Sequence, residues 1–127
     1  MSKPLRVGIA GLGTVGAGTL KLLGKQRDLL AQRCGRAITV TAVSARDRAR
    51  DRGIDVSSLR WYGDPLELTR APDVDVVVEL IGGSDGVAKH LVETAIANRK
   101  QVVTANKALL ALHGTALARA AESAGVT

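Results

Sequence analysis

Three glycines near the start of the chain have the spacing of a phosphate-binding turn. Residues 11–16 read GLGTVG, a G-x-G-x-x-G pattern, and they follow the apolar run Leu5–Ala10. In this pattern the first glycine permits a tight turn, the second lets the backbone approach a pyrophosphate, and the third lets helix and strand pack closely. The amides of the first helical turn then face the anion. The predicted pyrophosphate site consists of Gly11, Leu12, Gly13, Thr14, Val15 and Gly16. A glycine-rich bend without a ligand is the alternative.

The residues after the second predicted strand bear on the choice of dinucleotide. That strand ends at Val43 and is followed by Ser44, Ala45 and Arg46, so no carboxylate stands where NAD needs one for its ribose hydroxyls. Arg46 would instead pair with a 2′-phosphate through its planar guanidinium, and Ser44 would donate to the same group. We therefore favour NADP over NAD. Asp47 keeps NAD open, because a shift by one residue would turn its carboxylate inward, and an exposed loop arginine is the alternative for Arg46.

Other kinds of chemistry find little support. His90 and His113 have no partners at metal-ligand spacing, so no metal site is predicted. No Ser-His-Asp set can be argued from the sequence. The single cysteine, Cys34, cannot form an internal disulfide.

Strands that alternate with helices must position these groups. We expect strands at residues 5–10, 38–43, 61–62, 74–80 and 101–103, with the start of another at 126–127. We expect helices at residues 14–33, from 64 onward, from 84 or 85 to 98, and at 107–112 and 115–124, the last two split by His113 and Gly114. This order predicts an α/β fold, namely a Rossmann-type doubly wound parallel sheet in three layers, truncated before or at the sixth strand.

Local signals set several of these bounds. Gly24 is expected to bend the first helix, and Gly35 to end it in a left-handed turn. Asp64 is expected to cap the next helix, with Pro65 in its first turn and Glu67 bonding back to the cap.

Composition fits one dinucleotide-binding domain over residues 1–127. Apolar residues make up 46% of the chain, and the aromatic residues are only Trp61 and Tyr62. The core must therefore be built from aliphatic side chains. No apolar run approaches the roughly 20 residues of a membrane span, and no signal-peptide pattern precedes the first strand. We expect a cytoplasmic protein that does not associate with membranes.

The net charge of +6 is concentrated between Lys25 and Arg52. Such a stretch attracts nucleic acid, an anionic cofactor or an acidic partner, or it is a solvated face. No aromatic residues interleave with it, so base stacking is poorly supported and no nucleic-acid partner is expected.

Four motifs together resemble one enzyme family. They are GLGTVG (11–16), VSARD (43–47), VVELIGG (77–83) and VTANKALLA (103–111). In this order they closely resemble the N-terminal domain of homoserine dehydrogenase along essentially the whole chain. The resemblance implies reduction of aspartate semialdehyde to homoserine with NAD(P)H, and the reverse oxidation, in threonine, methionine and isoleucine biosynthesis.

The resemblance also implies further site residues. Ile81, Gly82 and Gly83 would bring the backbone close to the cofactor; Thr104 and Asn106 would bond its ribose or amide. Lys107 would hold a cofactor phosphate or polarise the substrate carbonyl, which makes it the candidate catalytic residue of this chain. The alternatives are a helix cap for Asn106 and an exposed first-turn lysine for Lys107. For Glu79 we favour the prediction of a strand-end carboxylate that is hydrogen-bonded to nearby backbone.

The family's catalytic and dimerisation region follows this domain, and it is absent from the chain. We therefore expect a fragment that binds the cofactor but does not turn over substrate, from a homo-oligomeric, monofunctional parent. The rival hypotheses are a non-catalytic NAD(P)-sensing module, which has no need of Lys107, and a basic nucleic-acid binder.

Overall fold

One parallel sheet forms the centre of the fold. The computed structural model describes residues 3–46, 53–54, 56–81 and 86–127. Five strands pair in the order β3-β2-β1-β4-β5, and each adjacent pair is parallel. The strands are β1 (Leu5–Ala10), β2 (Ile38–Ser44), β3 (Arg60–Tyr62), β4 (Val76–Glu79) and β5 (Gln101–Thr104). This order confirms the predicted Rossmann-type sheet.

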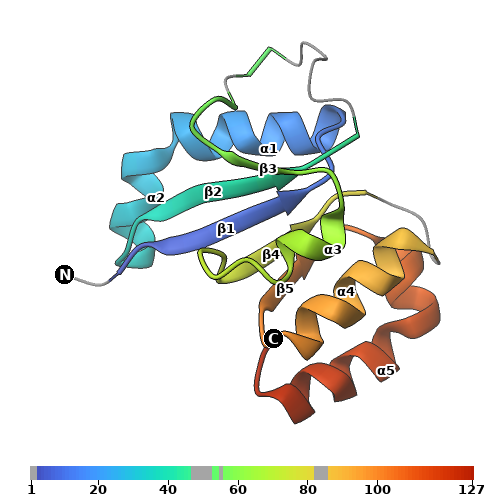
Figure 1. The fold of residues 1–127 in the computed structure, drawn as a ribbon. Coiled ribbons are helices and arrows are strands. Elements are labelled where there is room, and N and C mark those ends of the chain that lie inside the picture. Colours follow the sequence, from blue (N-terminus) through green and yellow to red (C-terminus); the bar gives the residue numbers. More distant parts are fainter. Residues whose placement is uncertain (1–2, 47–52, 55, 82–85) are drawn as a thin grey trace.

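Helices lie on both faces of the sheet, as the three-layer prediction requires (Figure 1). They are α1 (Thr14–Lys25), α2 (Arg27–Cys34), α3 (Pro65–Leu68), α4 (Val87–Ala97) and α5 (Lys107–Ala124). On one face, Leu23 of α1 packs in a cluster with Ile9 of β1. On the other face, Leu68 of α3 and Leu91 of α4 pack with Val77 of β4. Successive side chains of β1 and β4 point to opposite faces of the sheet and therefore contribute to two separate aliphatic cores.

A glycine inside β1 allows α3 to approach the sheet. A Cβ atom at Gly8 would lie 2.8 Å from Leu68 Cδ2 and 3.1 Å from Val74 Cγ1. Both of these side chains are buried. The absence of a side chain at position 8 is thus part of the core packing.

The helix predicted over residues 14–33 is in fact two helices, α1 and α2. They meet at Gln26, which has φ −101° and ψ 19°. The expected bend at Gly24 is wrong, because Gly24 lies within α1. The Gln26 amide donates to Leu22 O and its carbonyl accepts from Leu30 N. Both backbone groups of Gln26 therefore keep a hydrogen bond at the break. Gly35 ends α2 in the left-handed region at φ 75°, as predicted.

The predicted split of the last helix at His113 and Gly114 is also wrong. α5 runs through both residues. Leu109 and Leu117 lie on either side of Gly114, and both are buried in a cluster with Val92 of α4. Burial of this face outweighs the roughly 1 kcal/mol that a glycine costs inside a helix.

Other element ends shift by a few residues. Strand pairing in β4 covers only part of the predicted 74–80, although Asp75 N still donates to Arg6 O and Leu80 N to Ala10 O. α4 begins at Val87 and ends at Ala97. Residues 126–127 are not in a strand, but the Thr127 carbonyl accepts from Val102 N.

The helix start at Asp64 is confirmed in part. Asp64 Oδ1 accepts from Leu66 N at 2.9 Å and Pro65 occupies the first turn, but the helix is only four residues long. The polar stretch at residues 44–58 is described only in part, since residues 47–52 and 55 lie outside the described residues.

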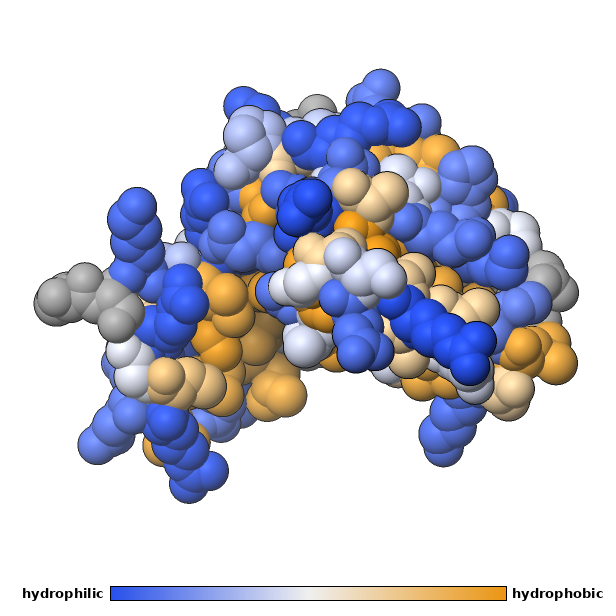
Figure 2. Space-filling model, turned by 90° about the horizontal axis from the view of Figure 1, so that it is seen from below, coloured by the Kyte–Doolittle hydropathy of each residue, from blue (hydrophilic) through white to orange (hydrophobic). Residues whose placement is uncertain are grey.

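Large apolar side chains remain at the surface. Val15, Val103 and Leu112 are each more than half exposed. Figure 2 shows apolar side chains in a hollow on the underside, flanked by hydrophilic side chains. None of the described helices combines the length and apolar composition needed to cross a bilayer.

Candidate functional site

The carboxyl ends of several strands open on one cleft of about 500 Å³. Parallel strands bring their following loops to a common edge, where open α/β sheets bind ligands. The predicted cofactor residues that line the cleft are Gly11, Leu12, Gly13, Ser44, Arg46 and Ile81. The structure therefore brings together groups from three separate loops. Gly82 and Gly83 lie outside the described residues.

The turn from β1 into α1 requires glycine at two positions. Gly11 has φ +103°, and a Cβ atom there would lie 2.9 Å from the carbonyl carbon and oxygen of Leu80. A Cβ atom at Gly16 would overlap the Gly11 carbonyl oxygen. The first and third glycines of the pattern thus permit the tight turn and the close approach of helix and strand.

The second glycine and the amino end of α1 face the cleft. A Cβ atom at Gly13 would meet no heavy atom within 4 Å, so the site is open there. Gly13 is the N-cap of α1 and offers no side-chain cap, and the first turn contains no acidic residue. Asp64 and Asn106 cap α3 and α5 with their side chains, whereas α2 and α4, like α1, have no side-chain cap. Of the three uncapped helices, only α1 follows the glycine turn that lines the cleft. The amino end of α1 is therefore suited to an anion such as a pyrophosphate.

The end of β2 is bonded to the glycine turn. Gly11 N donates to the Ser44 carbonyl oxygen at 2.8 Å. Ser44 itself is 2% exposed, whereas Arg46 is exposed and lines the same cleft. Arg46 thus lines the same cleft as the glycine turn. Asp47, the residue that keeps NAD open, lies outside the described residues.

A fully buried carboxylate joins the ends of β4 and β5. Glu79 Oε2 accepts from Ile81 N and Oε1 accepts from Thr104 Oγ1, each at 2.7 Å. The prediction that the Glu79 carboxylate is hydrogen-bonded to nearby backbone is therefore confirmed.

Other predicted residues do not line the cleft. Thr14, Val15 and Gly16 lie in the first turn of α1, and Thr104, Asn106 and Lys107 lie at the connection from β5 to α5. Asn106 Oδ1 accepts from Leu109 N at 3.0 Å, so Asn106 is the helix cap of α5. Lys107 is exposed in the first turn of that helix. Thr104 Oγ1 also accepts from Asn106 N at 3.0 Å, which fixes the turn between strand and helix.

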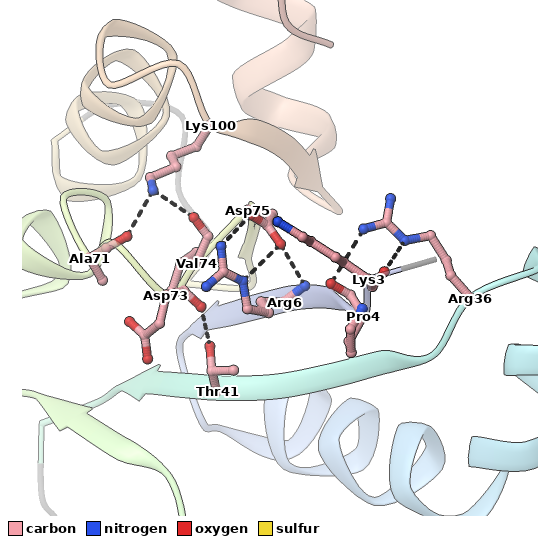
Figure 3. A network of polar contacts seen from close by, with 10 residues as sticks. All are labelled: Lys3, Pro4, Arg6, Arg36, Thr41, Ala71, Asp73, Val74, Asp75 and Lys100. Atoms are coloured by element: carbon pink, nitrogen blue, oxygen red, sulfur yellow. Dashed lines mark hydrogen bonds and ion pairs between the residues drawn. The ribbon is translucent and has the colours of Figure 1, made fainter. Parts of the chain in front are cut away.

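A larger cleft, of about 760 Å³, lies at the opposite, amino-terminal edge of the sheet. Arg6 donates to both carboxylate oxygens of Asp75, at 3.1 and 3.0 Å, and Lys100 Nζ donates to the carbonyls of Ala71 and Val74 (Figure 3). Hydrogen bonds from Arg6 lower the pKa of Asp75, and burial lowers the pKa of Lys100. These cations connect strand beginnings and are engaged in structural bonds.

Part of the basic stretch at residues 25–52 has the same kind of role. Arg36 Nε donates to Lys3 O at 2.9 Å and its Nη2 donates to Pro4 O at 3.3 Å (Figure 3). Arg36 therefore holds the segment that leads into β1. Lys25, Arg27 and Arg33 are exposed.

Some cleft residues were not predicted. They are Ala45, Gly63, Pro65, Leu80 and Val87. Gly63 and Pro65 follow β3 and were detectable, because the rule that gathers strand ends at one edge applies to that strand as well. Val87 follows the loop after β4, and no pattern in the sequence identified it.

The remaining candidates of the sequence do not gather into a site. His90 lies on α4, His113 lies within α5, and Cys34 is exposed at the end of α2. Over the described ranges, no three His, Cys, Asp or Glu residues are grouped so as to hold a metal ion.

Comparison with known proteins identifies close relatives. The family model for "Homoserine dehydrogenase, NAD binding domain" matches residues 11–127. A homoserine dehydrogenase of Pseudomonas aeruginosa is 45% identical over 124 residues, which are 98% of this chain and 28% of that protein. The crystal structure of a homoserine dehydrogenase from Thiobacillus denitrificans matches with a TM-score of 0.88 and 41% identity, over 97% of this chain and 28% of that one. The enzyme of S. aureus matches with a TM-score of 0.89 and 32% identity, over 100% and 32% of the two chains.

Proposed function

The chain belongs to the homoserine dehydrogenase family as its NAD-binding domain, and we propose that it holds NAD(P) for the interconversion of L-aspartate 4-semialdehyde and L-homoserine. When bound, the cofactor supplies or accepts the hydride of that reaction. The observation that carries the proposal is the open amino end of α1, which follows the tight turn at Gly11 and faces the cleft. The chain spans 28% of the length of its relative from P. aeruginosa.

In this proposal the glycine turn binds the pyrophosphate. Residues 11–16 supply backbone amides, and the helix dipole of α1 favours the negative charge. Gly13 lets the phosphates approach the backbone, because nothing lies within 4 Å of the position of a Cβ there.

NADP is the proposed form of the cofactor. Arg46 is exposed on the cleft lining, two residues beyond β2. In this proposal its guanidinium binds a phosphate on the adenosine ribose. A guanidinium can donate two parallel hydrogen bonds to phosphate oxygens. Ser44 would add a hydroxyl donor from the end of the same strand.

The loops after β4 and β5 are proposed for the nicotinamide half. In this proposal Ile81, Gly82 and Gly83 would approach the cofactor, and Thr104 and Asn106 would bond its ribose or amide. Lys107 would hold a phosphate or polarise the substrate carbonyl from the first turn of α5.

The chain alone is proposed to bind the cofactor without turnover. Hydride transfer requires donor and acceptor carbons held in near contact, and a proton must reach the new alkoxide. We assign the groups for these tasks, and homo-oligomer formation, to the remainder of the full-length enzyme. Substrate-dependent oxidation of NADPH by the 127-residue chain would contradict this assignment.

Thermal unfolding with NADP and with NAD tests the binding proposal. A ligand at 100 times its dissociation constant stabilises the folded state by about 2.7 kcal/mol, which raises the Tm of a domain of this size by roughly 10 °C. We expect a larger rise with NADP than with NAD at equal concentration. No rise with either nucleotide would refute cofactor binding, and equal rises would refute the preference.

A further inference from the structure

Glu79 is an acid at a position where packing alone would favour an apolar residue. It is 0% exposed at the end of β4. Val77, two residues earlier on the same face of the strand, is also 0% exposed and packs in the aliphatic cluster with Leu68 and Leu91. Burying a valine stabilises the fold, whereas burying a carboxylate destabilises it unless hydrogen bonds compensate for the lost hydration. The hydrogen bonds that Glu79 accepts must therefore offset the cost of burying it.

Two donors to Glu79 among the described residues come from the ends of two neighbouring strands. Ile81 N, which donates to Oε2, begins the loop that follows β4. Thr104 Oγ1, which donates to Oε1, is the last side chain of β5. Each distance is 2.7 Å, in the short range of charge-assisted hydrogen bonds. One side chain thus fixes the departure of both loops from the sheet.

The bonds continue into the turn that leads to α5. Thr104 Oγ1 accepts from Asn106 N, and Asn106 Oδ1 accepts from Leu109 N, each at 3.0 Å. The strand register places Glu79 opposite Thr104 on one side and opposite Ala10, the residue before the glycine turn, on the other. Glu79 therefore lies between the strand that leads into the pyrophosphate turn and the strand that leads toward Lys107 at the start of α5.

We propose that Glu79 is a positioning residue for the nicotinamide half of the cofactor. Its carboxylate holds Ile81 and the Thr104–Asn106 turn in the one arrangement that can bind that half, without touching the cofactor itself. This inference rests on the proposed function, because it presumes that the two loops bind NAD(P).

Replacement of Glu79 by glutamine tests the role with little change of shape. A glutamine that accepts from Ile81 N must turn its amide nitrogen toward Thr104 Oγ1, and the Thr104 hydroxyl proton then loses its acceptor. We expect the dissociation constant of NADP, measured by calorimetry well below the Tm, to rise about tenfold. The dissociation constant of adenosine 2′,5′-bisphosphate, which has no nicotinamide, should change by less than about twofold.

Amide hydrogen exchange gives a second readout. In Glu79→Gln the amides of Ile81 and Asn106 should exchange faster, while amides in the middle of β4 and β5 keep their protection. A role limited to general stability would instead weaken protection throughout the sheet and would weaken both ligands alike.

Thr104→Val and Thr41→Val form a matched pair, which also serves if Glu79→Gln does not fold. Thr104 Oγ1 donates to Glu79 at 2.7 Å, and Thr41 Oγ1 donates to Asp73 O at 2.8 Å. We expect Thr104→Val to raise the ratio of the NADP to the adenosine bisphosphate dissociation constant and also to speed exchange of the Ile81 amide, which bonds the other oxygen of Glu79. Loss of a direct contact between Thr104 and the cofactor would leave exchange of the Ile81 amide unchanged. Thr41→Val should change neither quantity.

The possible failures are distinguishable. If the wild-type chain binds both ligands and neither Glu79→Gln nor Thr104→Val changes their ratio, the positioning role is overturned and the proposed function stands. If the wild-type chain binds neither ligand, the proposed function is overturned and the positioning role with it.

Discussion

Gly16→Ala and Gly18→Ala add the same methyl group to the same helix, and we expect opposite effects on stability. A Cβ atom at position 16 would overlap the Gly11 carbonyl oxygen and lie 2.8 Å from its carbonyl carbon. At position 18, no heavy atom beyond the helix's own backbone lies within 4 Å. The two sites therefore differ in packing alone.

The expected magnitudes follow from these contacts. Alanine is favoured over glycine inside a helix by about 0.5–1 kcal/mol, so Gly18→Ala should raise the free energy of unfolding by that amount. Gly16→Ala gains the same helix-propensity contribution, but α1 must move away from the turn that follows β1. Overpacking costs about 1–3 kcal/mol where side chains can adjust, and here the obstacle is backbone. We expect a net loss of at least about 2 kcal/mol.

Urea unfolding followed by circular dichroism measures both effects, and calorimetry with NADP measures their consequence for binding. Gly16→Ala should weaken NADP binding, because the shift displaces the amino end of α1 from Gly11. Gly18→Ala should bind as the wild type does. Equal stability and equal NADP affinity of the two variants would refute the argument that close contact at Gly16 builds the site.

Three further substitutions test other parts of the structure. Arg46→Ala should weaken NADP by about tenfold or more and leave NAD unchanged in calorimetry; an unchanged ratio would count against the 2′-phosphate role. Asp75→Asn should be less stable than the wild type at pH 7. Arg6 lowers the folded-state pKa of Asp75 below its ordinary 3.8, so the wild-type advantage should disappear as the pH falls from about 5 through that lower pKa. A difference in the free energy of unfolding in urea between the wild type and Asp75→Asn that stays constant with pH would argue against a lowered pKa of Asp75. Arg99 has φ 59°, so Arg99→Gly should raise the free energy of unfolding by about 1 kcal/mol in urea; a loss would show that its side chain has a stabilising role.

The parts of the fold that local chemistry determines were predictable. The left-handed turn at Gly35 and the cap at Asp64 depend on neighbours in sequence, and so do the glycines of the β1–α1 turn. β4 was recognisable because a run of valines buried on both faces is typical of a parallel strand.

Tertiary packing decided what the sequence left open. The break at Gln26 has no helix-breaking residue. Gly114 remains helical because Leu109 and Leu117 are buried on both sides of it. In the site, the bond between Glu79 and Thr104 depends on the strand register, which local patterns do not specify. Gly63 reaches the cleft only because β3 pairs with β2.

The central place of β1 has a consequence for synthesis of the chain. Val7 pairs with Val40 of β2 on one side and with Val76 of β4 on the other. β1 therefore cannot pair with β4 until the ribosome has made residue 76. Contacts of such sequence separation form slowly. At a translation rate of about 5–20 residues per second, the backbone edge of β1 that later pairs with β4 stays open for several seconds. Slow translation between residues 44 and 76 should therefore raise the demand for chaperones on the ribosome.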